Sequence, residues 1–444
     1  AWHYQEAGAT QKAIIYCQKA SERAWQLSAA NEAIAHLRQG LTLLEKLPDS
    51  PERKRQELTL QMSLVMPLQA AKGFGTPDMQ TVCDRAYLLS QQVGQMPQLI
   101  IILSALGSYY LSSGQYHTSL KLAQQKLELA QHSQDDLQIA LARLGLTANY
   151  IQLGKFIQAR EHIDKMLDFY DFRQHPALAS DHTFDPGING IIWAAWTAWV
   201  LGYPDQARRH SQEAIEMARI LDQPLALAAA LEVSGSILDI SMRDYKAASK
   251  KLQESLPLAA DHQFYSFVLE GTFYQGLLHV INGATDEAIT QMKQAMAGWR
   301  TTGMRIMYTH MLGFLAESLG RVGQIEAGLQ TLDEAFNEVR TRDERFFEAE
   351  LYRIKGDLLQ KSGAETSVIE AAYWQAIIIA RQQSSKSWEL RATLHLARLW
   401  QRQGKSDDAQ MALSDIYAWF TEGFDTPDLQ EALALLDGLP IESS

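Results

Sequence analysis

Cysteine is scarce in this 444-residue chain, which contains only Cys17 and Cys83. Two cysteines so far apart in sequence exclude a disulfide-rich scaffold and a zinc site built from closely spaced thiolates, and they are typical of a reducing compartment. Proline and glycine are also few, at 12 and 27 residues, while hydrophobic residues make up 46% of the chain. This composition argues against a mainly disordered protein.

Basic residues are outnumbered, with 40 Lys and Arg against 52 Asp and Glu, for a net charge of −12. Such a charge repels phosphate backbones and anionic lipids, so we expect neither nucleic acid nor a membrane as partner. The most apolar run, residues 188–203, is interrupted by Asn189 and Gly190 and is shorter than the roughly 20 residues that span a bilayer. The first residues show no basic-then-apolar leader. We therefore expect part of a longer cytoplasmic protein.

A chain of this length exceeds the ~250–300 residues at which one hydrophobic core stops growing, so it contains several domains or a repeat array. A turn position recurs with steps of 40, 48, 41, 40, 40, 40 and 41 residues. It is occupied by Gly114, Gly154, Gly202, Arg243, Gly283, Gly323, Gly363 and Gly404. Glycine readily adopts the left-handed conformation that ends a helix. The period therefore predicts helical hairpins of about 40 residues.

Small residues recur at fixed distances from each turn, and they explain the pairing of the helices. Seven residues before the turn the side chain is always small, and five residues after it only Val368 is bulky. Apolar residues between these markers have helical spacing, without strand-like alternation. A single hairpin cannot bury both faces, so the hairpins must stack. We predict an all-α fold, a right-handed superhelical solenoid of tetratricopeptide-like hairpins whose first helices line the inner wall.

Three regions are predicted along the chain. Residues 1–50 form shorter helical units, residues 51–423 form the solenoid with an insertion at 171–186, and residues 424–444 form a C-terminal capping helix and tail. Thr76-Pro77-Asp78 and Thr426-Pro427-Asp428 both read as helix starts, with Thr as the cap and Pro in the first turn.

The markers around the first regular turn, namely Gly107, Tyr110, Gly114 and Tyr116, resemble the tetratricopeptide repeat, although the spacing exceeds the usual ~34 residues. The longer unit resembles the solenoid of the bacterial maltose-regulon activator and related signal-transduction ATPases. The segments at 3–8, 32–53, 201–207 and 344–359 are similar to the C-terminal region of bacterial multidomain AAA-type ATPase regulators, often fused to class III nucleotidyl cyclase or kinase domains. The resemblance implies a solenoid that senses a ligand or partner and restrains the ATPase module of the parent chain.

No catalytic, cofactor-binding or metal-binding set is predicted. Lys405 and Ser406 match the end of a phosphate loop, but the glycine and the preceding strand that such a loop needs are missing. The insertion contains His175, Asp181, His182 and Asp185, whose spacing matches no known ligand signature. Single histidines on helices have no partner that the sequence fixes. We therefore predict a protein that is not an enzyme.

Tetratricopeptide geometry predicts a groove that changes halfway from apolar and aromatic to charged. The candidate binding residues on this concave face are Trp196, Trp199, Phe273, Glu317, Arg321, Glu350, Arg353 and Arg398. The two tryptophans either pack against neighbouring hairpins or form an exposed ligand patch. The charged positions either form a solvated face of weak ion pairs or offer Arg353 and Arg398 as fork donors to a carboxylate or phosphate.

The sequence favours a protein-interaction or effector-sensing solenoid that binds a protein segment or small effector. A ligand that prefers one curvature could shift an attached ATPase between two states. The alternative is a self-assembly scaffold that holds parent chains together as a homo-oligomer.

Overall fold

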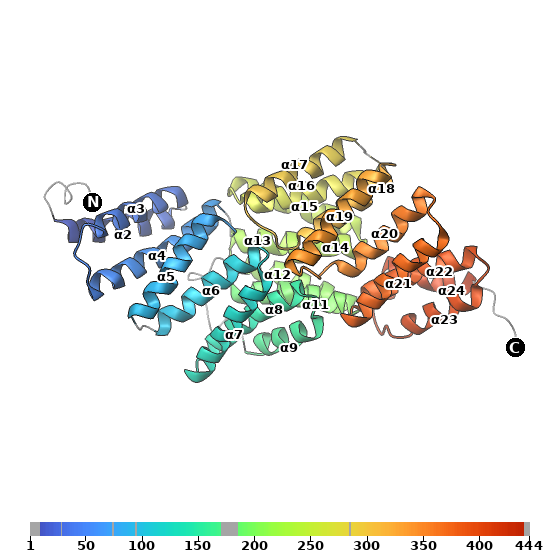
Figure 1. Ribbon diagram of the computed structural model, residues 1–444, viewed down its shortest axis with the longest axis horizontal. Helices are drawn as coiled ribbons and strands as arrows, with labels where there is room; N and C mark the ends of the chain where they lie inside the picture. Colours follow the sequence, from blue (N-terminus) through green and yellow to red (C-terminus); the bar gives the residue numbers. More distant parts are fainter. Residues whose placement is uncertain are drawn as a thin grey trace. The chain divides into compact units, whose positions relative to one another are not determined.

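The structure is a computed structural model that describes residues 9–27, 29–72, 75–93, 96–169, 185–283 and 286–438. The regular elements in these ranges are all helical and include no strand, which confirms the predicted all-α solenoid of helical hairpins (Figure 1). The described residues divide into two compact units. Unit 1 comprises those up to 145 together with 300–306, and unit 2 comprises the remainder.

Unit 1 is built from successive antiparallel helices. They are α2 (Thr10–Gln26), α3 (Ala30–Leu44), α4 (Pro51–Lys72), α5 (Pro77–Val93), α6 (Met96–Ser112), α7 (Tyr116–His132) and the first part of α8 (Asp136–Gln152). Their apolar faces share one core that includes Leu37, Leu64 and Leu89. Cys17 and Cys83 are both free and buried in this core. The helix start predicted at Thr76-Pro77-Asp78 is confirmed, since α5 begins at Pro77.

Unit 2 contains the most regular part of the array. Its helices are α9 (Phe156–Leu167), α11 (Pro186–Val200), α12 (Pro204–Ile220), α13 (Pro224–Ala229), the π-helical η1 (Ala230–Ile237), α14 (Leu238–Ser241), α15 (Tyr245–Asp261), α16 (Tyr265–Ile281), α17 (Asp286–Thr301, whose end belongs to unit 1), α18 (Tyr308–Arg321), α19 (Ile325–Arg342), α20 (Glu348–Ser362), α21 (Thr366–Gln382), α22 (Lys386–Arg402), α23 (Ser406–Tyr417) and α24 (Pro427–Gly438). The predicted C-terminal helix is α24. The predicted boundary at residue 50 falls inside unit 1, and that at residue 423 falls inside unit 2. The division into shorter units, solenoid and cap therefore stays a prediction.

The repeated turn is confirmed at every predicted position. The seven glycines have φ between 67° and 93°, and Arg243 adopts the same left-handed conformation with φ of 65°. A second series of left-handed residues ends the second helices of the hairpins. It includes Gln134, Asp222, Gln263, Gly303, Asp343, Ser384 and Gly423. Only two of these seven are glycines, so the glycine pattern of the sequence did not reveal this second series.

One described stretch, Pro224–Ser241, is long and apolar enough to cross a membrane by length and composition. It comprises α13, η1 and α14, and 78% of it is buried inside the structure. Burial of this extent is that of a core helix, because the first helix of each hairpin packs between its neighbours.

The first helices of the hairpins in unit 2 wind so tightly that distant repeats meet. Helix α11 contacts α22, and the hydroxyl of Ser387 donates a hydrogen bond to the carbonyl oxygen of Trp199. The rings of Trp199 and Trp388 lie edge to face with centroids 4.5 Å apart. The wall of the superhelix is therefore closed on itself here, within unit 2.

This winding corrects the prediction that aromatic side chains line an open groove. Trp196, Trp199 and Phe273 have exposed fractions of 0%, 3% and 0%. The Trp196 ring packs edge to face against Phe346, at 5.4 Å between centroids, and its Nε1 donates to the carbonyl oxygen of Val233. These rings therefore form an aromatic core. The two tryptophans pack against other hairpins and do not form an exposed ligand patch.

Candidate functional site

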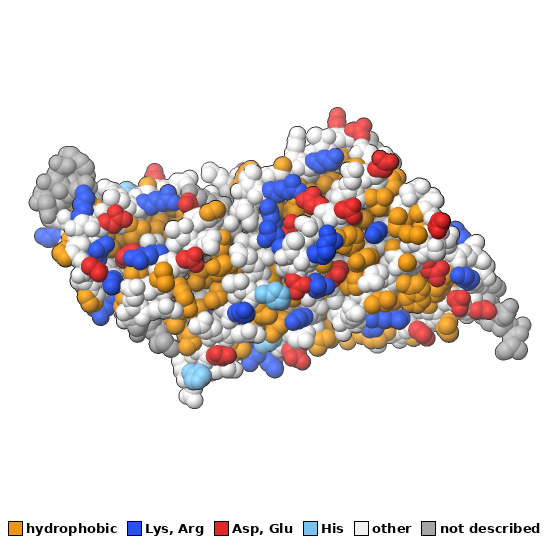
Figure 2. Space-filling view, viewed as in Figure 1, with side chains coloured by type: hydrophobic (Ala, Val, Ile, Leu, Met, Phe, Trp, Pro, Cys, Tyr) orange, Lys and Arg blue, Asp and Glu red, His pale blue; other side chains and the backbone are white. Residues whose placement is uncertain are grey.

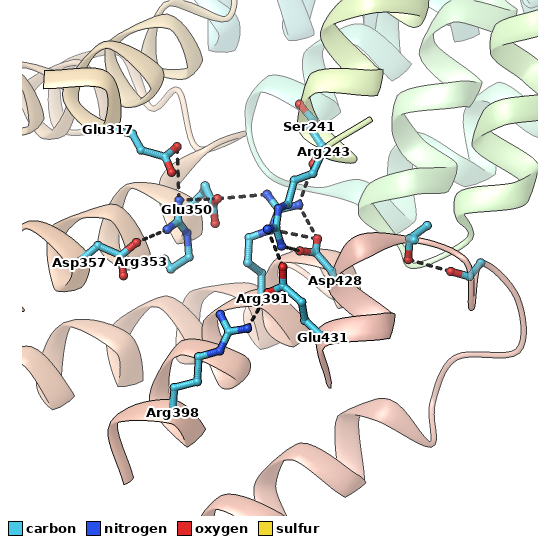
Figure 3. Close-up of polar contacts among 12 residues, drawn as sticks. Ser241, Arg243, Glu317, Glu350, Arg353, Asp357, Arg391, Arg398, Asp428 and Glu431 are labelled. Atoms are coloured by element: carbon cyan, nitrogen blue, oxygen red, sulfur yellow. Dashed lines mark hydrogen bonds and ion pairs between the residues drawn. The ribbon is translucent and has the colours of Figure 1, made fainter. Parts of the chain in front are cut away.

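Nine charged side chains in unit 2 form one continuous network of alternating sign, most of which is drawn in Figure 3. In order of contact they are Arg321, Glu317, Arg353, Glu350, Arg391, Asp428, Arg243, Glu431 and Arg398. The structure thus brings together all five charged candidates predicted from the sequence. We call these nine residues the charge network.

The middle of the charge network is buried. Glu350 Oε1 lies 2.9 Å from Arg353 Nη2 and 3.2 Å from Arg391 Nη1, and these three side chains are at most 8% exposed. Burial alone would lower the pKa of each arginine, but the neighbouring carboxylates outweigh it and raise the pKa. Glu350 and Arg353 are therefore neither on a solvated face nor free to bind a ligand as they stand. Their charges are paired with each other and with Arg391 inside the protein.

Both ends of the charge network reach the surface. Arg321 at one end is 42% exposed and pairs with Glu317 on the same helix, α18. Arg398 on α22, at the other end, is 37% exposed and pairs with Glu431 of α24 at 2.7 Å. Of the predicted candidates, these two arginines are the most accessible. Elsewhere the face in Figure 2 shows basic and acidic side chains interspersed with hydrophobic ones.

Arg398 also lines a hollow between α20, α21 and α22. This hollow has a volume of about 200 Å³. Its lining residues are Asp357, Gln360, Lys361, Tyr373, His395, Arg398 and Arg402. We call it the basic hollow, because it holds three permanent cations and one carboxylate.

The one carboxylate of the basic hollow is fully engaged. Asp357 accepts hydrogen bonds from the Tyr373 hydroxyl at 2.7 Å and from Arg353, and it contacts His395 Nδ1 at 2.7 Å. Burial alone would raise its pKa, but the charges of His395 and Arg353 outweigh it and hold the pKa of Asp357 below its ordinary value. Burial and the charge of Asp357 in turn raise the pKa of Tyr373. Asp357 is thus a fixed anion that orients two of the lining side chains.

Two cations of the basic hollow have no carboxylate partner among the residues that the structure describes. Lys361 Nζ donates to the carbonyl oxygen of Gly320 at 3.0 Å, and Arg402 Nη2 donates to Gln360 Oε1 at 2.7 Å. Both partners are neutral and both side chains are exposed, so neither cation is held in an ion pair with a described residue. The hollow is consequently suited to a small anion.

The size of the hollow limits what it can hold. Pockets for drug-sized ligands occupy roughly 300–1,000 Å³, so about 200 Å³ suits a single carboxylate group with its stem. An arginine fork offers such a group paired N–H donors in one plane. A peptide side chain or chain end can therefore be anchored here while the rest of the ligand stays outside.

Sequence reasoning missed Arg243, Asp428 and Glu431. A signal existed for Arg243, which stands at the one repeat turn that lacks glycine. Asp428 and Glu431 lie in the predicted capping helix, but the spacing of the hairpins does not indicate that this helix returns to residue 243. That proximity follows from the winding of unit 2.

A second group of buried charges lies at the π-helical segment η1. Glu232 of η1 is fully buried, and Glu270 of α16 is 7% exposed. Ser255 donates to Glu232 Oε2 at 3.3 Å. Burial raises the pKa of Glu270 to about 8, and burial together with the charge of Glu270 raises that of Glu232. At neutral pH Glu270 is therefore expected to hold its proton, and burial also favours the protonated form of Glu232.

The acid pair predicts a pH dependence of stability. Glu270 binds a proton more tightly in the folded than in the unfolded chain, so its contribution to stability falls as the pH rises from 4.5 to about 8. Glu270→Gln is expected to raise the Tm at pH 8 by about 2–4 °C for each kcal/mol gained, with little change at pH 4. Thermal unfolding between pH 4 and 9 measures this. Glu254→Gln, at a half-exposed surface pair, is the control, and parallel pH profiles of Glu270→Gln and the original chain would contradict the prediction.

The other motifs considered in the sequence have no chemical role that the structure supports. Gly404, before Lys405 and Ser406, is an ordinary repeat turn with φ of 75°. Asp185 caps α11 by accepting from the backbone N–H groups of residues 187 and 188, while His175, Asp181 and His182 lie outside the described residues. Within the described ranges, no three His, Cys, Asp or Glu side chains are grouped to hold a metal ion.

Comparison with known proteins gives one family match. A family described as "Tetratricopeptide repeat" matches residues 192–213 and 390–413. These segments cover the turns at Gly202 and Gly404, one at each side of the closed wall of unit 2. No curated protein sequence gives a significant match.

Solved structures with the same fold are distant in sequence. A Rap protein complexed with competence and sporulation factor is 14% identical, with a TM-score of 0.61 over 84% of this chain and 99% of the other. The APC/C hetero-tetramer Cut9-Hcn1 is 11% identical, with a TM-score of 0.51 over 95% and 75%. A signal transduction ATPase (STAND) protein with a tetratricopeptide repeat sensor, from Pyrococcus horikoshii, is 14% identical, with a TM-score of 0.39 over 87% and 54%. The first two of these structures, together with the family match, show that this chain has the tetratricopeptide-like solenoid fold.

Proposed function

We propose that this chain is a non-enzymatic sensing solenoid of a larger cytoplasmic signalling protein, and that it binds a protein segment or small effector through an acidic group in the basic hollow. The observation that carries this proposal is the pair of cations, Lys361 and Arg402, whose only hydrogen-bond partners in the described structure are neutral. Next to them, Arg398 adds a third cation. The output would be an attached ATPase module, as the resemblance to signal-transduction ATPases implies.

The charge of the whole chain makes the site selective. With a net charge of −12, the chain repels an acidic ligand at long range, so binding must come from a local concentration of positive charge. Among the neighbours of known structure, a Rap protein has been solved with competence and sporulation factor bound. That complex supports a ligand-binding role for a solenoid of this shape.

Binding can be tested with a fluorescein-labelled hexaglutamate peptide, followed by fluorescence anisotropy at low salt. We expect saturable binding that weakens as salt is added, because exposed charges are screened. Lys361→Gln with Arg402→Gln is expected to weaken binding by about tenfold or more, since each charge-assisted hydrogen bond contributes about 1.5–3 kcal/mol.

Two controls separate the site from the general surface. Arg219→Gln removes a half-exposed arginine that pairs with Glu254 elsewhere in unit 2, and it is expected to leave the affinity unchanged within twofold. A hexalysine peptide measures attraction to the acidic surface. Equal affinity of the double variant and the original chain would reject the basic hollow as the site. A dilution-resistant oligomer that binds no peptide would favour the assembly scaffold instead.

A further inference from the structure

The C-terminal segment at residues 419–438, which we call the strap, ties together two parts of unit 2 that are far apart in sequence. Before α24 begins, the backbone N–H of Gly423 donates to Asp205 Oδ2 at 3.0 Å, and Glu422 Oε1 accepts from the backbone N–H of Gln206 at 2.9 Å. These contacts hold the strap against the start of α12. Helix α24 itself contacts α22 and α23.

Within the strap, Glu431 joins two arginines, one on each carboxylate oxygen. Its Oε1 accepts from Arg243 Nη2 at 2.6 Å, and its Oε2 accepts from Arg398 Nη2 at 2.7 Å. Arg243 lies at the turn between α14 and α15, and Arg398 lies on α22 (Figure 3). Burial alone would raise the pKa of Glu431, but the hydrogen bonds from both arginines outweigh it and lower the pKa. Glu431 is therefore an ionised bridge between the two.

Arg243 is the one residue in its series of turns that is not glycine. Every other turn in this series is a glycine, whereas Arg243 adopts a φ of 65°, a conformation that strains a residue with a Cβ atom. Its guanidinium makes two ion pairs to the strap, at 3.0 Å to Asp428 and 2.6 Å to Glu431. A glycine at this turn would remove the strain and both contacts.

Arg398 connects the bridge to the basic hollow. It lines the hollow, and its one ion pair among the described residues is that from Nη2 to Glu431. A guanidinium has five N–H donors, and among the described residues Arg398 uses only Nη2, toward Glu431. Glu431 thus presents a carboxylate to Arg398 as a bound acidic group would.

We propose that Glu431 is an internal competitor of the ligand: an acidic group that enters the basic hollow takes over Arg398 and so removes one of the two ionic links between the strap and α22, the other being that of Arg391 with Asp428. This proposal rests on the proposed function, because it assigns the regulation of the same site. After the exchange Glu431 keeps its ion pair with Arg243, and Asp428 keeps its ion pair with Arg391 of α22. The strap therefore stays attached but is held less tightly to α22. Because coupling is reciprocal, loosening of the strap must tighten ligand binding.

The strap can be tested with Glu431→Gln and, as the matched control, Asp437→Asn. Asp437 lies exposed on the same helix, in no ion pair with a described residue, so its variant removes the same charge without touching Arg398. Without any ligand, Glu431→Gln is expected to speed amide hydrogen exchange in α24 by about fivefold or more, whereas Asp437→Asn leaves it unchanged. An unchanged exchange rate in Glu431→Gln would overturn the proposal that Glu431 holds the strap in place.

The ligand arm uses the labelled hexaglutamate peptide. Glu431→Gln is expected to bind the peptide about fivefold more tightly than the original chain, and saturating peptide is expected to speed exchange in α24 of the original chain. One outcome is that the peptide binds the original chain and binds the Lys361 and Arg402 double variant more weakly, while Glu431→Gln leaves the affinity unchanged. That result would support the proposed function and reject the competition by Glu431. If no variant binds the peptide, the proposed function itself fails.

Discussion

Replacing Arg391 by alanine is expected to destabilise unit 2 by about 3–5 kcal/mol, as is typical when one partner of a buried ion pair is removed. The guanidinium is 8% exposed. It donates to Asp428, to Glu350 at 3.2 Å and to the carbonyl oxygen of Ser241 at 2.7 Å. Without it, Glu350 and Asp428 lose a cation that compensates their buried charges. Of the three arginines that pair with the strap, Arg243 and Arg398 would remain.

Urea unfolding followed by tryptophan fluorescence measures this loss, since eight of the ten tryptophans lie in unit 2. The control is Arg219→Ala, whose arginine pairs with Glu254 at 2.6 Å but is 47% exposed. Its loss is expected to be below about 1 kcal/mol, because exposed ion pairs contribute little. Equal losses for the two variants would show that Arg391 is not part of a buried network.

Trp196→Ala is expected to cost about 3–5 kcal/mol, the usual range for removing a large aromatic side chain from a core. The ring is 0% exposed and contacts Trp199, His310 and Phe346 at centroid distances of 5.4–5.7 Å. The His310 ring is itself fixed by hydrogen bonds with Ser241 and Tyr274. Loss of Trp196 would leave a cavity between helices that belong to distant repeats.

The matched control is Trp374→Ala, because the Trp374 ring is only partly buried and packs against Trp400 at 5.8 Å. The same urea titration is expected to give a clearly smaller loss for this variant. The experiment also decides between the two interpretations of Trp196 that the sequence left open. If Trp196→Ala kept its stability but lost the hexaglutamate peptide, the ring would be a ligand contact.

The hairpin architecture could be predicted from the sequence because it depends on local chemistry. A glycine recurring every 40 residues marks a left-handed turn, and small residues at fixed distances mark the closest approach of paired helices. Even the exception, Arg243, adopts the predicted conformation. Each of these signals lies within one repeat, where spacing along the chain determines spacing in space.

The winding of the repeats could not be predicted in this way. Whether Trp199 faces an open groove or meets Trp388 depends on small rotations accumulated over several hairpins, which no residue spacing records. The same holds for the charge network, in which Arg391 and Arg243 meet Asp428. Whether each candidate residue is exposed or buried is decided by repeats far away in sequence, as the burial of Trp196 and Arg353 shows.

The contact between α11 and α22 also bears on synthesis. An open array can fold repeat by repeat as it leaves the ribosome, but Ser387 and Trp199 are 188 residues apart. At about 5–20 residues per second, roughly 10–40 s pass between the appearance of the two. During that interval the indole of Trp199 is not yet packed against Trp388, and the nascent chain exposes an apolar aromatic surface. Chaperone capture is expected to be strongest at this stage of translation.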